Sequence, residues 1–301
     1  MNKLENRALE VTIQKIGSDN NIEFSKIFNN LNVKFSYRTY RGSPMGGKGS
    51  VSICGLNRDT LDTLISFSAS AKTIKERKLI QVKAGYGDRL ALIINGSIIS
   101  AIPTAPPDIW LKCDVINGYE LRKKHITTTI EEGLTLSNYA QAVADVVGIP
   151  LEMRITDSDY LNKKMSGKSF EGNIFQLAYT IKEAFKYDKN TDNFGGIVAY
   201  IENETLIVDY RDIPSDERRT ENPLLISKDT GMVGLPEFSN DAQLASITTL
   251  LKPEIKTGDV IEVKSEQIKG ANGLFFVQGI TYTGEFRGTS WYSTFSCWRI
   301  R

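Results

Sequence analysis

Residues 274–300, LFFVQGITYTGEFRGTSWYSTFSCWRI, carry the pattern that decides the fold. Two apolar runs, Leu274–Val277 and Ile280–Thr283, lead to a turn over Gly284–Gly288, and the aromatic-rich run Trp291–Ile300 follows. Short runs of β-branched and aromatic residues between glycine-containing turns are typical of antiparallel strands. The stretch shows no helical period, so it predicts a sheet.

The pattern begins further upstream, at a short strand before residue 274. Val260–Val263 alternates apolar and polar residues, as a half-buried strand requires. Turn residues at Lys252–Glu254 and Thr257–Asp259 separate this strand from Thr248–Leu251. Four or so strands at this spacing predict a small closed or sandwiched antiparallel sheet over residues 223–301.

The first part of the chain, residues 1–122, has a second β-rich pattern. Val33, Phe35 and Tyr37 alternate with polar residues, and the chain returns after Gly42–Gly49 as a second alternating run. This predicts a hairpin with a long tip. A short helix carrying Leu61, Leu64 and Ile65, capped by Asn57 or Asp59, and strands near 79–84, 90–94, 97–102 and 109–117 complete the unit.

Residues 123–222 predict an α+β region between the two β units. Thr135 and Asn173 are expected to cap two helices, and Gly148 is expected to end the first. A strand over 151–155 and a hairpin over 197–210, turning at Asn203-Glu204, accompany the helices. The polar stretches 157–172 and 214–223 are interpreted as an exposed loop and a linker.

The composition excludes several classes of protein. Lys and Arg number 37 and Asp and Glu 36, so no broad basic field is available for a phosphate backbone. Cys54, Cys113 and Cys297 lie far apart and have no zinc-ligand spacing, which fits a reducing cytoplasm. No apolar run reaches the length of a membrane span or a signal-peptide core, and we expect assembly in the cytoplasm.

Catalytic and nucleotide-binding motifs are weak. Gly42–Gly49 differs from a phosphate-binding loop because Gly49 stands where a hydroxyl should bind magnesium, and a strand follows instead of a helix. His125 is the only histidine and lies next to the basic residues Arg122–Lys124, where a surface role is favoured over a Ser-His-Asp site. No cofactor and no metal are predicted.

Three carboxylate pairs are considered for a wall-degrading activity. They are Glu131 with Glu132, Asp157 with Asp159, and Glu202 with Glu204. A glycosidase needs one carboxyl in a desolvated pocket, whereas these pairs lie in polar, turn-rich sequence. Charged turns are therefore favoured, and a tail-associated peptidoglycan hydrolase stays an alternative.

Aromatic and basic residues alternate in two places, as in single-strand nucleic-acid platforms. These are Tyr37–Arg41 and Trp298–Arg301. Tyr37 and Arg38 fall on opposite strand faces, so core-and-surface alternation is favoured over specific nucleic-acid binding. Trp291, Phe295 and Trp298 are interpreted as core or subunit-contact residues.

Several segments taken in order resemble one protein family. They are Thr230–Pro236, Leu250–Asp259, Val277–Glu285 and Gly288–Tyr292, together with Val51–Thr60, Val82–Tyr86 and Asn95-Gly96 in the first half. Their order and spacing resemble the baseplate hub proteins of contractile-tailed bacteriophages, the bacteriophage Mu type. The resemblance extends over nearly the whole chain, and its middle third matches less closely than either end.

The resemblance implies a mainly β fold, with two small β-barrel domains of the tube type flanking the α+β region. It implies a homotrimer whose six barrels, roughly 9–117 and 224–301 of each chain, join a sixfold tail tube to a threefold central spike. The implied partners are the tail tube protein, the central spike protein and other baseplate proteins, with DNA only passing through the channel. The hub of a phage-like secretion or bacteriocin particle is an alternative. Candidate subunit or tube contacts are Arg38, Arg41, Lys48, Trp291 and Trp298.

Overall fold

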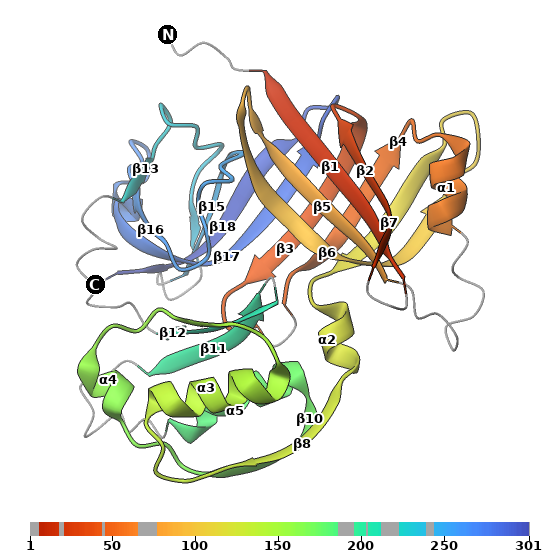
Figure 1. Cartoon of the computed structure of the whole chain (residues 1–301). Coiled ribbons are helices and arrows are strands. Elements are labelled where there is room, and N and C mark those ends of the chain that lie inside the picture. The colour runs from red at the N-terminus through yellow and green to blue at the C-terminus, as the bar shows by residue number, and fades with distance from the viewer. Residues whose placement is uncertain are drawn as a thin grey trace. The chain divides into compact units, whose positions relative to one another are not determined.

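The structure is a computed structural model that describes residues 6–17, 21–43, 46–65, 77–185, 196–202, 204–211, 223–238 and 244–300. Its contacts divide the chain into two units, each with its own apolar core (Figure 1). Unit 1 comprises 1–39, 47–117 and 223–301, and unit 2 comprises 40–46 and 118–222. The contacts place the first and last β segments in one unit. The division into three domains stays a prediction.

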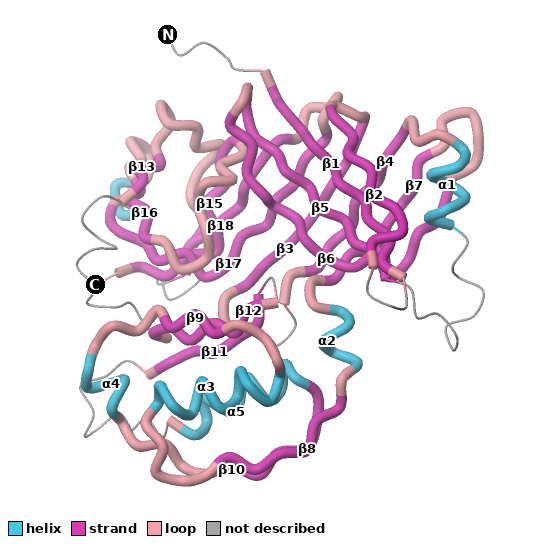
Figure 2. Tube along the Cα trace, viewed as in Figure 1, coloured by secondary structure: helices cyan, strands magenta, loops and turns pink. Residues whose placement is uncertain are grey.

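Unit 1 is built around a 13-stranded sheet (Figure 2). Its first segment supplies β1 (Arg7–Ile16), β2 (Ile22–Asn29), β3 (Asn32–Tyr40), β4 (Lys48–Cys54), β5 (Arg77–Tyr86), β6 (Arg89–Pro103), β7 (Trp110–Ile116) and the helix α1 (Arg58–Ile65). Its last segment supplies β13 (Leu224–Ile226), β14 (Glu237–Phe238), β15 (Leu244–Leu250), β16 (Val260–Val263), the 3₁₀ turn η1 (Lys269–Ala271), β17 (Gly273–Glu285) and β18 (Trp291–Arg299).

The two segments join where β17 lies next to β3 in the strand order β14-β15-β18-β17-β3-β4-β7-β6-β5-β1-β2. All other neighbours in unit 1 come from the same segment, with β13 and β16 attached beside β17. The mainly β prediction is confirmed. The described strands form one open sheet and do not close into the two predicted barrels.

The alternation predicted for the first hairpin is confirmed. Val33, Phe35 and Tyr37 of β3 are buried, as are Val51 and Ile53 of β4, while the residues between them face outward. These side chains belong to the core of unit 1, which also contains Phe295 and Trp291 of β18. The alternation of apolar and polar residues therefore indicated correctly which side chains of this hairpin are buried.

The break predicted between the strands near 90–94 and 97–102, at Asn95 and Gly96, is wrong. Both residues lie inside β6, and the turn that joins β5 to β6 is at Gly87-Asp88. A Cβ atom at Gly96 would lie 2.8 Å from the carbonyl oxygen of Ile116, so the glycine permits a close approach of β7. Two predicted strands are accordingly one long strand.

The two helices predicted for residues 123–222 are present in unit 2. They are α3 (Leu136–Val147) and α5 (Ile174–Ala184). The Thr135 side chain accepts a hydrogen bond from the Asn138 backbone, Gly148 ends α3 with φ 74°, and Asn173 forms a capping box with Gln176. Both helices bury their apolar faces in the core of unit 2.

The sheets of unit 2 are small. The pair of β8 (His125–Ile130) and β10 (Lys168–Asn173) is antiparallel, and a second sheet has the order β11-β12-β9. Its strands are β9 (Leu151–Met153), β11 (Ile197–Glu202) and β12 (Thr205–Tyr210), which confirms the predicted hairpin. The short helices α2 (Tyr119–Lys123) and α4 (Ser158–Asn162) complete the unit.

The polar stretch 157–172 was predicted to be a loop, and this is wrong. It contains α4 and most of β10. Its polar residues lie on exposed faces, while Tyr160 and Met165 are buried in the core of unit 2. The linker predicted at 214–223, except for Pro223, and the centre of the hairpin tip, Pro44 and Met45, lie outside the described residues.

Candidate assembly surfaces

The candidate catalytic groups lie at the surface of unit 2. His125 faces Glu171 at 3.3 Å, and both side chains are largely exposed. Glu131, Glu132 and Asp159 are also exposed, and Asp157 caps α4 by accepting a hydrogen bond from the Asp159 backbone. None of these carboxyl groups has the desolvated setting of a glycosidase acid.

The described residues hold no group of three or more His, Cys, Asp or Glu side chains suited to a metal ion. Every helix in the described part of the chain is too short or too polar to span a bilayer. The glycine-containing segment 42–49 leads into β4, a strand, so it lacks the helix N-terminus of a phosphate-binding loop.

Arg41 is held inside unit 2. Its Nη2 lies 2.9 Å from Oδ2 of Asp209, and both side chains are 0% exposed. The guanidinium also donates hydrogen bonds to the backbone carbonyls of Tyr210 and Arg211. In the same unit, burial raises the pKa of the Tyr200 hydroxyl to about 12. These contacts fix Arg41 to the end of β12 in unit 2.

Arg38 and Lys48 are exposed and lie opposite each other in the register of β3 and β4. Like charges in directly opposed positions of an antiparallel pair disfavour the pairing. The register thus places two basic residues side by side on this hairpin.

The two tryptophans of β18 have different settings. Trp291 is 1% exposed, its ring packs against Phe35 at 5.5 Å, and the Arg7 guanidinium lies 5.3 Å from its centroid. Trp298 faces the opposite side of the strand and is 37% exposed. Trp291 thus has an intramolecular packing role, whereas Trp298 is partly exposed to solvent.

Sequence reasoning missed an apolar surface at the end of the β6–β7 hairpin, residues 99–109, here named the apolar knob. Ile99, Ile102 and Ile109 are 42%, 62% and 40% exposed, and Pro103, Ala105, Pro106 and Pro107 are exposed beside them. The prolines marked a loop in the sequence. The apolar residues of this loop are evident in the sequence, but only the structure shows that their side chains face solvent.

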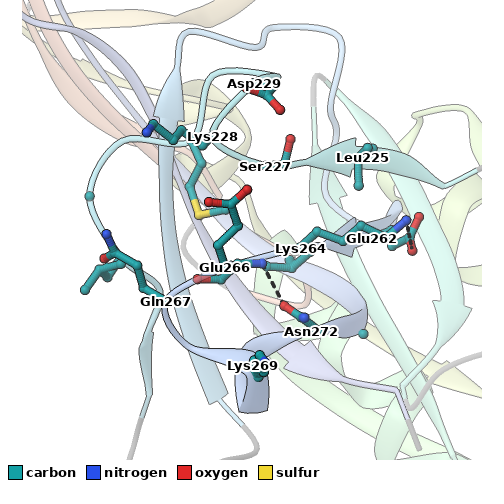
Figure 3. A pocket seen from close by; sticks show the side chains of 16 residues that line it. Leu225, Ser227, Lys228, Asp229, Glu262, Lys264, Glu266, Gln267, Lys269 and Asn272 are labelled. Carbon is teal, nitrogen blue, oxygen red and sulfur yellow. Dashed lines mark hydrogen bonds and ion pairs between the residues drawn. The ribbon is translucent and has the colours of Figure 1, made fainter.

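A pocket of about 870 Å³ lies in the last segment of unit 1 and is here named the seam pocket (Figure 3). It lies between the segment from β13 to β14 and the turn after β16. Its apolar lining includes Leu225, Met232, Leu235 and Val263. Its polar rim is ordered by a Lys264–Glu262 ion pair at 3.0 Å and by a hydrogen bond of 2.7 Å from the Ser265 backbone to Asn272.

The fold is shared by tail proteins and by secretion-system proteins. The 43 kDa tail protein of prophage MuSo2 from Shewanella oneidensis is 12% identical, covers 96% of both chains and has a TM-score of 0.62. A tail protein from Neisseria meningitidis MC58 is 10% identical, with 98% of this chain and 96% of that one covered and a TM-score of 0.62.

The Escherichia coli c3393 protein, described as a component of the type VI secretion system, is 8% identical and has a TM-score of 0.55. The alignment covers 100% of this chain and 75% of that one. The sequence has no match among curated proteins.

A family profile described as "Baseplate hub gp41" matches residues 8–297. The match includes both β segments of unit 1 and the inserted α+β unit, and it confirms the resemblance that the segments of the sequence indicated. The chain belongs to the baseplate hub gp41 family.

Proposed function

We propose that this baseplate hub protein forms a homotrimer that joins the sixfold tail tube to the threefold central spike and surrounds the tail channel. The observation that carries the proposal is the composition of the sheet in unit 1. Seven of its strands come from the first segment and six from the last. Three chains with two such segments supply six β segments, a number that matches a sixfold ring to a threefold axis.

Exposed sheet edges support assembly with other chains. The edge strand β2 pairs only with β1 among the described strands, and its Ile22 and Ile27 are 57% and 61% exposed. A long edge strand with exposed isoleucines and no proline is a site where another chain adds on. Arg38, Lys48 and Trp298 are the proposed contacts to neighbouring subunits or to the tube.

The test is the mass and symmetry of the purified protein. Light scattering over a range of concentrations is expected to show a trimer or a monomer–trimer equilibrium, and averaged electron-microscope images down the axis are expected to show six similar modules. A stable dimer contradicts the proposal.

The proposed role is structural, without catalysis. A peptidoglycan suspension is expected to keep its turbidity at high protein concentration, because the exposed carboxylates of unit 2 have no apolar pocket. Clearing that is lost in Glu131→Gln or Asp157→Asn would establish the hydrolase instead.

The similarity to secretion-system proteins favours a second context for the same role. Chains of a Francisella PdpA–VgrG complex share this fold at a TM-score of 0.57 and 9% identity, with 99% of this chain covered and 59% of that one. The hub of a phage-like particle needs the same ring. The genes next to this one distinguish the two contexts, since a virion requires capsid genes.

A further inference from the structure

The turn between β17 and β18, residues 285–290, lies at the joint where the last segment of unit 1 meets the first. The Phe286 backbone N–H donates a hydrogen bond to the Val33 carbonyl of β3 at 2.8 Å. Beside it, Nζ of Lys34 lies 3.2 Å from Oε1 of Glu285. The turn therefore stands at the end of the β3–β17 neighbourhood, the one place in the described sheet where strands of the two segments lie next to each other.

A side chain from the start of β1 contacts the same turn. Nη1 of Arg7 donates hydrogen bonds to the carbonyls of Glu285 at 3.0 Å and of Gly288 at 2.7 Å. Nη2 of Arg7 donates to the Thr289 carbonyl at 3.2 Å. We name this cluster of one guanidinium and three carbonyls the Arg7 clasp. In the strand order β1 is reached from β17 only through β3, β4, β7, β6 and β5, so the clasp connects β1 to the last segment without strand pairing.

The ring of Trp291 orients the guanidinium. The Arg7 guanidinium lies 5.3 Å from the ring centroid, a cation–π contact with a side chain that is 1% exposed. The same ring packs against Phe35 of β3 at 5.5 Å and against Phe286 of the turn at 6.2 Å. These ring-to-ring contacts do not use the charge of Arg7, so we expect the aromatic core of the joint to stay packed when the guanidinium is removed.

Three carbonyl oxygens that converge on one point need a cation between them, because their partial negative charges repel one another. The guanidinium has five N–H donors in a planar fork and binds several acceptors at once, whereas a lysine ammonium is a compact point charge. The turn is also closed from within. The Glu285 N–H donates to the Ser290 carbonyl at 2.7 Å, and the Gly288 N–H donates to the Glu285 carbonyl at 3.1 Å. The closed turn thus keeps its carbonyls directed at Arg7.

We propose that Arg7 is a positioning residue whose guanidinium locks the β17–β18 turn against the start of β1 and makes the joint between the two segments of unit 1 rigid. Without the guanidinium, the β3–β17 neighbourhood, the packing around Trp291 and a hydrogen bond of 3.3 Å from Nζ of Lys256 to the Leu92 carbonyl still connect the segments. The turn itself is then free to open.

The consequence for assembly rests on the proposed homotrimer. A ring of six β segments requires the same angle between the two segments in every chain, because closed symmetry repeats each contact. The Arg7 clasp supplies that constant angle.

Amide hydrogen exchange tests the clasp. In Arg7→Ala, the amides of Glu285, Phe286 and Gly288 are expected to exchange faster by on the order of tenfold, because charge-assisted hydrogen bonds that hold the turn are lost. Amides of unit 2 are expected to be unchanged. Methylguanidinium added to Arg7→Ala is expected to slow the exchange again, since it restores a cation among the three carbonyls. Arg7→Lys is expected to give an intermediate rate.

Arg58→Ala is the control, because it also removes an arginine from unit 1 but one whose side chain is 93% exposed. It is expected to leave the exchange at 285–290 unchanged. Far-UV circular dichroism checks that each variant is folded.

Unchanged exchange at the turn in Arg7→Ala overturns the clasp. Faster exchange spread evenly over unit 1 also overturns it, as does fast exchange that neither methylguanidinium nor Arg7→Lys reduces.

Light scattering separates the clasp from the proposed trimer. Arg7→Ala is expected to dissociate at higher concentration than the unchanged protein, and a trimer of equal stability contradicts the role of the clasp in the ring. If the unchanged protein forms no trimer, the proposed function is wrong, while the exchange at 285–290 still decides whether Arg7 locks the turn.

Discussion

Arg41 and Asp209 form a fully buried ion pair in which each charge depends on the other. Removing one partner leaves an uncompensated buried charge, so Arg41→Met or Asp209→Leu is expected to lower the free energy of unfolding of unit 2 by about 3–5 kcal/mol. The double variant is expected to recover most of that loss. Urea unfolding followed by fluorescence measures each value.

The control for this pair is the partly exposed ion pair of Lys83 with Glu10 on unit 1, whose side chains are 44% and 22% exposed. Lys83→Met is expected to change the free energy of unfolding by less than about 1 kcal/mol, because exposed ion pairs contribute little. Equal effects of Lys83→Met and Arg41→Met would contradict the special role of the buried pair.

The three cysteines are expected to differ in reactivity. Burial raises the pKa of the Cys113 thiol to about 12 and raises the pKa of the Cys297 thiol as well, so both stay protonated and covered near neutral pH. Cys54 is only partly buried. Mass spectrometry after maleimide treatment of the native protein should show modification at Cys54, and in urea at all three; rapid modification of Cys297 in the native protein would refute its burial.

The helix caps of unit 2 are the clearest case in which single residues determine where an element begins or ends. Thr135→Ala removes the acceptor for the Asn138 backbone N–H and is expected to lower the free energy of unfolding by about 1 kcal/mol. Thr135→Ser keeps an oxygen in this position and is expected to have a much smaller effect. Chemical denaturation compares the two, and an equal loss in both would exclude a capping role.

Strand β17 passes so close to β3 that only a glycine fits at position 284. A Cβ atom there would overlap the ring of Phe35. Gly284→Ala is therefore expected to destabilise unit 1 by about 1–3 kcal/mol through overpacking, with partial relief by Phe35→Leu.

Gly270 is the control for this substitution, since a Cβ atom at Gly270 meets nothing within 4 Å. Thermal unfolding of Gly270→Ala is expected to resemble that of the unchanged protein. A similar loss in both variants would show that the ring of Phe35 is not responsible.

Elements with a local signal could be predicted from the sequence. Thr135, Asn173 and Gly148 mark helix ends because capping depends on neighbouring residues, and the alternation at Val33–Tyr37 marks a strand face. The neighbourhood of β17 and β3 could not be predicted, because pairing between distant segments leaves no periodic pattern in either one. Polar surface strands such as β10 fail for a related reason, since they lack an apolar face.

The candidate contact residues show the same limit of prediction from sequence. Arg38, Lys48 and Trp298 are exposed as a contact residue must be, but Arg41 and Trp291 belong to intramolecular clusters. Residue type alone does not distinguish an arginine that binds a buried aspartate far away in the sequence from one that faces a neighbour.

The residues that the structure describes form two apolar cores, one in each unit, and we expect two unfolding transitions. Leu177→Ala in unit 2 and Ile53→Ala in unit 1 each remove fully buried methyl groups, at an expected cost of about 2–5 kcal/mol. Calorimetry is expected to show each variant lowering a different transition. A single transition lowered equally by both would show that the cores unfold together.

The composition of the two units has a consequence for biosynthesis. All residues of unit 2 have been added once position 222 is reached, whereas unit 1 requires β18 near the end of the chain. Because folding proceeds as the ribosome elongates the polypeptide, the inserted unit is able to mature first. Until β18 has been translated, β3 lacks the segment that contains its neighbour β17, and binding of chaperones to the nascent chain is most useful in that interval.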